Sequence, residues 1–82
     1  MQRKASEEEL EQLIKIGKGL RKLRKERNYS NYHKLAYDMD MTHSQYGGYE
    51  KGKNMNVLTL IRILNFHEIS IQDFLKDYVS EG

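Results

Sequence analysis

The chain has 82 residues, which is enough for one small domain with a thin hydrophobic core. It contains no cysteine, which excludes disulfides, a cysteine nucleophile and a cysteine-ligated zinc site. Charged residues make up 32% of the chain, and no apolar run approaches the roughly 18–20 residues that a membrane span needs. The polar first residues predict that the chain carries no secretory signal. The absence of proline and of strand-type runs predicts an all-α protein.

Positive charge is concentrated in the first third of the chain. Residues 1–28 hold nine basic and five acidic residues, whereas residues 57–82 hold two basic and four acidic ones. The densest part runs from Lys15 to Arg27, where Glu26 is the only acid. A solvated helix face and a contact surface for a polyanion both explain such a run, and a net charge of +2 does not distinguish them.

A first helix is expected from Ser6 to Arg27. Ser6 and Glu9 have the Ser-x-x-Glu spacing of a capping box. Apolar residues recur at steps of three and four, which places on one face Leu10, Leu13, Ile16, Leu20 and Leu23. Gly17 lies in the middle of this helix and predicts that another backbone packs closely against it.

Two short helices are expected next, over residues 31–39 and 42–52. Thr42 and Gln45 have the spacing of a second capping box, and Gly52 is the expected left-handed stop.

Two further helices complete the expected set. The fourth follows Asn56 and is apolar all round, which predicts that it is the centre of the core; its apolar residues are Val57, Leu60, Ile61, Ile63, Leu64 and Phe66. The fifth is capped by Ser70 with Asp73 and is expected to turn inward Ile71, Phe74, Leu75 and Tyr78.

The two short helices and the turn between them have the arrangement of a helix-turn-helix. Such a unit holds its second helix so that the N-terminal residues of that helix enter the major groove of DNA. The small Ala36 allows the two helices to approach, Met41 fills the turn, and Tyr46 and Tyr49 anchor the second helix on the core.

With these features the chain resembles the lambda-repressor-like family of helix-turn-helix domains, the Cro/repressor or XRE type, over residues 14–75. The matching segments are, in chain order, Ile16-Gly17-x-x-Leu20-Arg21-x-Leu23-Arg24, Leu35-Ala36, Tyr49-Glu50-Lys51-Gly52-Lys53, Leu60-Ile61-x-Ile63 and Ile69-Ser70-Ile71-x-Asp73-Phe74. The resemblance implies a compact five-helix domain over residues 14–79. Residues 1–13 are then an N-terminal extension that continues into the first helix, and exposed Leu10 and Leu13 would make it a docking or dimerisation segment.

The resemblance also assigns roles to individual residues. Arg24 and Glu50 match the ion pair that joins the first helix to the end of the recognition helix. The positions that contact bases hold His43, Ser44, Gln45 and Gly48. The positions that contact phosphates hold Asn31, Tyr32, Lys51, Lys53 and Asn54.

Gly47 and Gly48 depart from the family pattern, because they are expected on the exposed face of the recognition helix, where other members carry side chains. Either the DNA backbone approaches this helix closely, or binding relies on phosphates and DNA shape, or the chain no longer binds DNA.

Other chemistry has little support in the sequence. The spacings between His33, His43 and His67 do not match a helical metal-binding pair, so no metal or other cofactor is expected. We expect His33 on the surface, His43 at the DNA face and His67 packed near the end of the fourth helix. No nucleophile–base pair is evident, and an enzyme is not expected.

The resemblance therefore predicts a sequence-specific regulator of transcription, a repressor, that contacts the major groove of double-stranded DNA with residues 42–51. It implies a homodimer on a near-palindromic site, a cytoplasmic location at the nucleoid of a bacterium or phage, and no membrane contact. The fifth helix, with Tyr78 and Val79, is the expected dimer surface. The alternatives are an antitoxin-type regulator that also binds a toxin, and a protein-interaction module with weakened base contacts.

Overall fold

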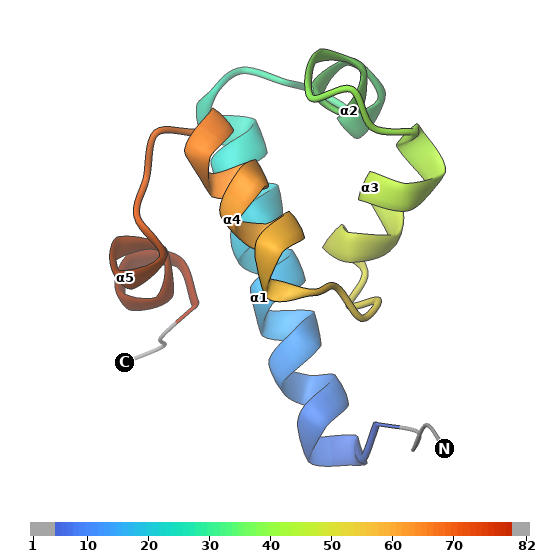
Figure 1. Cartoon of the computed structure of the whole chain (residues 1–82), viewed down its shortest axis with the longest axis vertical. Coiled ribbons are helices and arrows are strands. Elements are labelled where there is room, and N and C mark those ends of the chain that lie inside the picture. The colour runs from blue at the N-terminus through green and yellow to red at the C-terminus, as the bar shows by residue number, and fades with distance from the viewer. Residues whose placement is uncertain (1–4, 80–82) are drawn as a thin grey trace.

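The computed structural model describes residues 5–79 and confirms the all-α fold with five helices. The helices are α1 (Glu7–Glu26), α2 (Tyr32–Asp38), α3 (His43–Glu50), α4 (Val57–Phe66) and α5 (Ile71–Phe74), and α5 continues into a π-helical turn, η1 (Leu75–Val79). The long α1 crosses the whole domain, with α2 and α3 to one side of it and α5 to the other (Figure 1). None of the helices within residues 5–79 combines the length and the hydrophobicity needed to cross a lipid bilayer.

Each helix begins at a side-chain cap, and the caps are Ser6, Asn31, Thr42, Asn56 and Ser70. Ser6 and Glu9 form the predicted reciprocal capping box. Only half of the second box forms, because the Thr42 hydroxyl accepts a hydrogen bond from the backbone N–H of Gln45. The Gln45 side chain donates to the Tyr49 hydroxyl instead of returning to Thr42.

The first four helices all end in the same way, with one residue in the left-handed conformation. That residue is Asn28, Asp40, Gly52 or Glu68, with φ of 68°, 58°, 100° or 59°. The N–H of the next residue then bonds to a carbonyl five positions back, as in Lys53 to Gly48 at 2.9 Å and Ile69 to Leu64 at 3.1 Å. This is the Schellman arrangement, which satisfies carbonyls that the end of a helix leaves unpaired.

Each of the five helices contributes buried side chains to one hydrophobic core. Its buried members are Leu20, Leu23, Leu35, Ala36, Tyr46, Tyr49, Leu60, Ile63, Leu64 and Phe74. Two expectations are wrong here. Helix α4 is not buried all round, since Val57, Leu58 and Ile61 are exposed, and Ile71 and Leu75 also face solvent. A sequence pattern that is apolar on every side does not say which side lacks a neighbour.

Gly17 confirms the expectation of close backbone packing. A Cβ atom at this position would lie 2.5 Å from the carbonyl oxygen of Glu50 and 2.6 Å from that of Tyr49. The middle of α1 therefore touches the main chain at the end of α3. Any side chain at position 17 would push the two helices apart, so this glycine helps to set the position of α3.

Candidate nucleic-acid interface

The helix-turn-helix unit is built from α2, α3 and a short turn. Ala36 is fully buried where the helices approach, and its carbonyl accepts a hydrogen bond from Met41 N–H at 2.9 Å. Tyr46 and Tyr49 are buried on the inner side of α3, as the sequence predicts. The outer side of α3 is consequently left free at its first turn.

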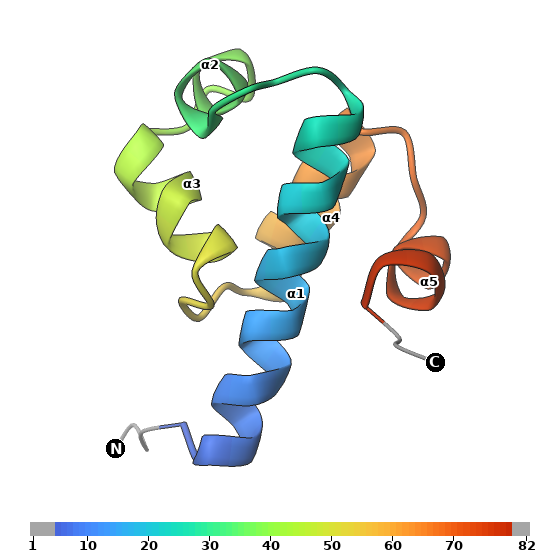
Figure 2. The ribbon, with the colours of Figure 1, turned by 180° about the vertical axis from the view of Figure 1, so that it is seen from behind.

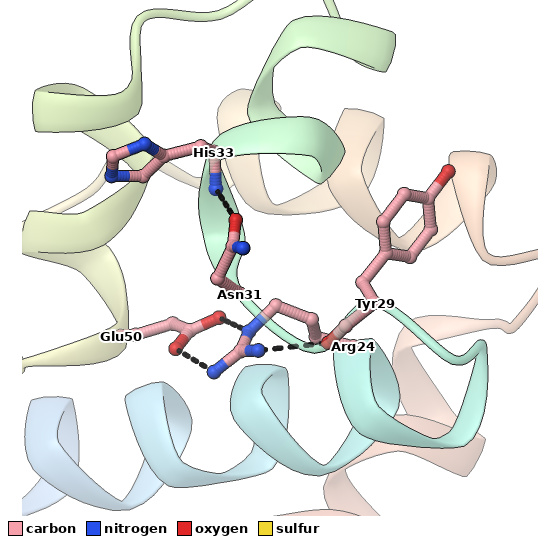
Figure 3. A network of polar contacts seen from close by, with 5 residues as sticks. All are labelled: Arg24, Tyr29, Asn31, His33 and Glu50. Carbon is pink, nitrogen blue, oxygen red and sulfur yellow. Dashed lines mark hydrogen bonds and ion pairs between the residues drawn. The ribbon is translucent and has the colours of Figure 1, made fainter.

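Arg24 and Glu50 form the predicted ion pair between α1 and the last residue of α3. Arg24 Nε lies 2.8 Å from Glu50 Oε2 and Nη2 lies 3.2 Å from Oε1, so the contact is bidentate. The third arm of the guanidinium, Nη1, donates to the carbonyl of Tyr29 at 2.9 Å (Figure 3). Both side chains are almost fully buried, with exposed fractions of 6% and 7%. The pair therefore joins α1, the loop before α2 and the end of α3.

The charge of Glu50 also affects a neighbouring tyrosine. Burial, and then the Glu50 carboxylate, raise the pKa of the Tyr46 hydroxyl above its ordinary value. This hydroxyl has no hydrogen-bond partner in the described part of the chain. Tyr46 is therefore a neutral core residue that packs the inner side of α3 against the core.

The predicted base-contacting residues lie at the start of α3. His43, Ser44 and Gln45 are all exposed, and together they form the first turn of the helix. The Gln45 amide nitrogen is occupied by the Tyr49 hydroxyl at 3.0 Å. His43 and Ser44 therefore offer the least committed polar groups on this surface.

The expectation that both glycines lie on the exposed face is wrong for Gly47. Gly47 is buried, and a Cβ there would lie 2.7 Å from a ring carbon of Tyr32. Gly48 is half-buried beneath the side chain of Lys53, whose Cδ would lie 3.0 Å from such a Cβ. Neither glycine represents a lost side chain on an open surface: Gly47 makes room for a packed tyrosine, and Gly48 makes room for a lysine.

The predicted phosphate-contacting residues divide into two groups. Lys51, Lys53 and Asn54 are exposed after α3. Asn31 is exposed as the cap of α2, where its side-chain oxygen accepts from His33 N–H at 3.0 Å. Tyr32 is half-buried with its ring against Gly47 and 6.4 Å from the ring of Tyr46, so its first role is packing.

His33 is a member of this surface that the sequence did not identify. Its imidazole extends from the start of α2 (Figure 3) and stacks on that of His43, with ring centroids 4.4 Å apart and planes at 24°. The two histidines lie ten positions apart on different helices, so only the crossing of α2 and α3 brings them together. Residues 5–79 contain no group of three or more possible metal-ligating side chains.

His67 lies outside this surface, in the core at the end of α4, as expected. It is buried, and neither ring nitrogen has a hydrogen-bond partner within residues 5–79. Burial, together with the nearby Arg27, lowers the pKa of His67 to about 4. This histidine is therefore neutral at physiological pH.

The comparison with known families agrees with this geometry. The chain matches the family model for the XRE and lambda-repressor-like helix-turn-helix over residues 20–74, more than half of its length. No curated protein and no solved structure matches the chain. The matched residues begin in α1 and end at the last residue of α5, and they include the Arg24–Glu50 pair and the whole unit of α2, turn and α3. The chain belongs to this helix-turn-helix family, a family of DNA-binding regulatory domains.

Proposed function

We propose that the protein is a sequence-specific regulator, a repressor, that places α3 in the major groove of double-stranded DNA. The observation that carries the proposal is the first turn of α3, where polar side chains are exposed while the rest of the helix is held by the core and by Glu50. A helix that presents its N-terminal side chains from a fixed position is the arrangement that base contacts require. His43, Ser44 and Gln45 are the proposed base contacts.

The cations beside α3 supply the proposed contacts with the DNA backbone. Lys51 and Lys53 carry charge next to the helix, and Asn31 and Asn54 provide neutral hydrogen-bonding groups. The alkyl chain of Lys53 crosses Gly48 and takes the space that a side chain at that position would fill. We include His33 with this group, since its stacking against His43 places it at the same surface.

A fluorescence-anisotropy titration tests the proposal. Random duplex DNA is titrated at several salt concentrations, and a pooled-sequence selection runs in parallel. We expect affinity to fall steeply with salt, and substitution of Lys51 and Lys53 by Ala to lower the salt slope by about one to two units. Ala at His43 or Ser44 relaxes the selected motif at particular base pairs and leaves the salt slope unchanged. A chain that binds no DNA at low salt contradicts the proposal.

A homodimer is part of the proposal, because one such module contacts only a short half-site. The dimer surface that we propose differs from the one expected from sequence. Tyr78 stacks on Phe74 within the chain, with ring centroids 5.9 Å apart, and its hydroxyl donates to Glu26. Val79 also packs against the core, whereas Ile71 and Leu75 are exposed. Ile71 in α5 and Leu75 in η1 are therefore the apolar side chains that we propose to contact a second copy.

A second candidate function is a module that binds a protein partner, such as the toxin of an antitoxin pair. The exposed apolar side chains on α4 favour it, since Val57 is 64% and Leu58 54% exposed. Leu10 in the proposed extension is also exposed, while Leu13 is only half-exposed. The same DNA titration separates a pure interaction module, which gives no salt-dependent binding, from the regulator. An antitoxin-type regulator binds DNA as well as its toxin, so binding to the partner distinguishes it.

A further inference from the structure

A row of basic side chains on α1 takes no part in the surface described above. Its members are Lys15, Lys18, Arg21, Lys22 and Lys25, and they are called the basic row below. All five are exposed, and none forms an ion pair with another residue in the described range. Glu26 is the only acidic residue between Lys15 and Arg27, and its carboxylate accepts a hydrogen bond from Tyr78.

The basic row faces away from the sides of α1 that pack against α3, α5 and the core, although Ile14 on the same arc contacts Gly52. Gly17 points at the end of α3, Gly19 points at Phe74, and Leu20 lies in the core. At about 100° per residue, Lys18 lies opposite the core, and the other four members lie on either side of it. Figure 2 shows α1 in front of α4, with α3 to one side and α5 to the other, and no helix of residues 5–79 lies in front of α1 in this view. A duplex seated on the first turn of α3 therefore meets a different surface from this row.

The density of these charges along α1 is similar to the density of phosphates along one strand of DNA. From Lys15 to Lys25 the helix rises about 15 Å, so the five cations are about 4 Å apart on average along its axis. One strand of B-form DNA carries one phosphate per about 3.4 Å of axis. The arrangement also has a cost, because like charges three and four positions apart weaken a helix. A polyanion bound along the row would reduce this repulsion, because none of the five cations forms an ion pair within residues 5–79.

We propose that the basic row is a second DNA-binding surface, which holds the backbone of a second double-stranded segment while α3 holds the first. The proposal rests on the proposed function for the first segment. It assigns no base contacts to α1, because lysine and arginine side chains on a smooth helix face engage phosphates without sequence information. Bound protein would then bring two segments of DNA together.

A capture assay tests this. The full chain is bound to an immobilised duplex at low salt, and retention of a second, fluorescent duplex is measured. The test variant is Lys18→Glu with Lys22→Glu, and the control is Arg62→Glu with Lys76→Glu, which changes the net charge equally at exposed positions outside α1. A third variant, Lys51→Glu with Lys53→Glu, reports on the α3 surface. Circular dichroism confirms that each variant is folded.

We expect the wild type and the control to capture the second duplex, and the Lys18/Lys22 variant to capture at least about tenfold less. Binding to a single duplex should fall equally in the test and control variants. Equal capture by the wild type, the control and the Lys18/Lys22 variant overturns the inference, because two copies of α3 in a dimer would then hold the two duplexes. So does a loss of single-duplex binding confined to the Lys18/Lys22 variant, which would place the row on the first duplex. If the wild type captures no second duplex but still binds a single duplex through Lys51 and Lys53, the inference is overturned and the proposed function is not. Absence of all DNA binding overturns the proposed function as well.

Discussion

At the scale of single residues, Gly47 and Gly48 adjoin in sequence but have different surroundings, so the same substitution should have opposite effects. A methyl group at position 47 meets the rigid ring of Tyr32 at 2.7 Å, whereas one at position 48 meets the flexible chain of Lys53 at 3.0 Å. Alanine favours a helix over glycine by about 1 kcal/mol. We expect Gly48→Ala to raise the free energy of unfolding by up to about 1 kcal/mol. Gly47→Ala should lower it by about 1 kcal/mol, because overpacking outweighs the gain.

Urea unfolding of the two variants measures both changes, and each serves as the control for the other. Equal stabilisation of both would mean that the Tyr32 ring moves aside freely. DNA binding by Gly48→Ala adds a functional test, since a displaced Lys53 should weaken binding at all sequences alike.

The buried imidazole of His67 gives a second prediction at this scale. The unfolded chain takes up a proton at this residue near its ordinary pKa of 6.5, whereas the folded chain does so only near 4. The unfolded state therefore binds more protons between these values, and stability falls as the pH is lowered from 6.5 to 4. We expect this residue to account for a loss of about 3 kcal/mol over that interval.

Thermal unfolding of His67→Leu across this pH range checks the prediction. The variant should lose less stability than the wild type as the pH falls. Parallel pH profiles for His67→Leu and wild type would contradict the assignment.

At the scale of elements, the Arg24–Glu50 pair fixes α1 against α3 and should be costly to break. Arg24→Ala leaves Glu50 buried without its partner and frees the Tyr29 carbonyl. We expect the free energy of unfolding to fall by about 3 kcal/mol, because an unpaired buried charge is strongly destabilising. Arg21→Ala, at an exposed position on the same helix, is the matched control. A melting temperature for Arg24→Ala equal to that of the control would show that the pair contributes little.

The helix ends offer a stabilising change. Glu68 has a left-handed φ of 59°, at the position in the end of α4 that Gly52 occupies in the end of α3. Its side chain is exposed and has no interaction within residues 5–79. Glu68→Gly should raise the free energy of unfolding by about 1 kcal/mol, because glycine adopts this conformation without strain. Glu68→Ala is the control and should give much less, as a differential scanning experiment would show.

The sequence predicts those elements whose determinants are local, and the rest depends on how helices cross. The caps and the helix-turn-helix spacing follow from neighbouring residues, the close packing at Gly17 follows from a glycine in mid-helix, and the Arg24–Glu50 pair follows from the family resemblance. The environment of Gly47 and the His33–His43 stack depend on where α2 lies against α3, which no periodicity specifies. The left-handed Glu68 was not predicted either, because glutamate rarely adopts this conformation at a helix end.

At the scale of the whole molecule, the proposed dimer surface can be separated from the exposed face of α4. Ile71→Lys with Leu75→Lys should convert a dimer to single chains of 9.8 kDa, as sedimentation equilibrium would show. Charged side chains at these positions would be buried without partners in the interface. The control is Val57→Lys with Leu58→Lys, an equal charge change on α4. Dissociation of the control alone would place the dimer surface on α4. A wild-type protein that sediments as a single chain would contradict the proposed dimer.

The attachment of α3 has a consequence for engineering. Its anchors are Glu50, Tyr46, Tyr49 and the backbone beside Gly17, and none of them is His43 or Ser44. The residues at positions 43 and 44, which face outward, can therefore be substituted without changing the residues that anchor α3. A display library randomised at positions 43 and 44 should remain folded in nearly all members, and selection from it on chosen duplexes would yield binders with new sequence preferences on one unchanged scaffold.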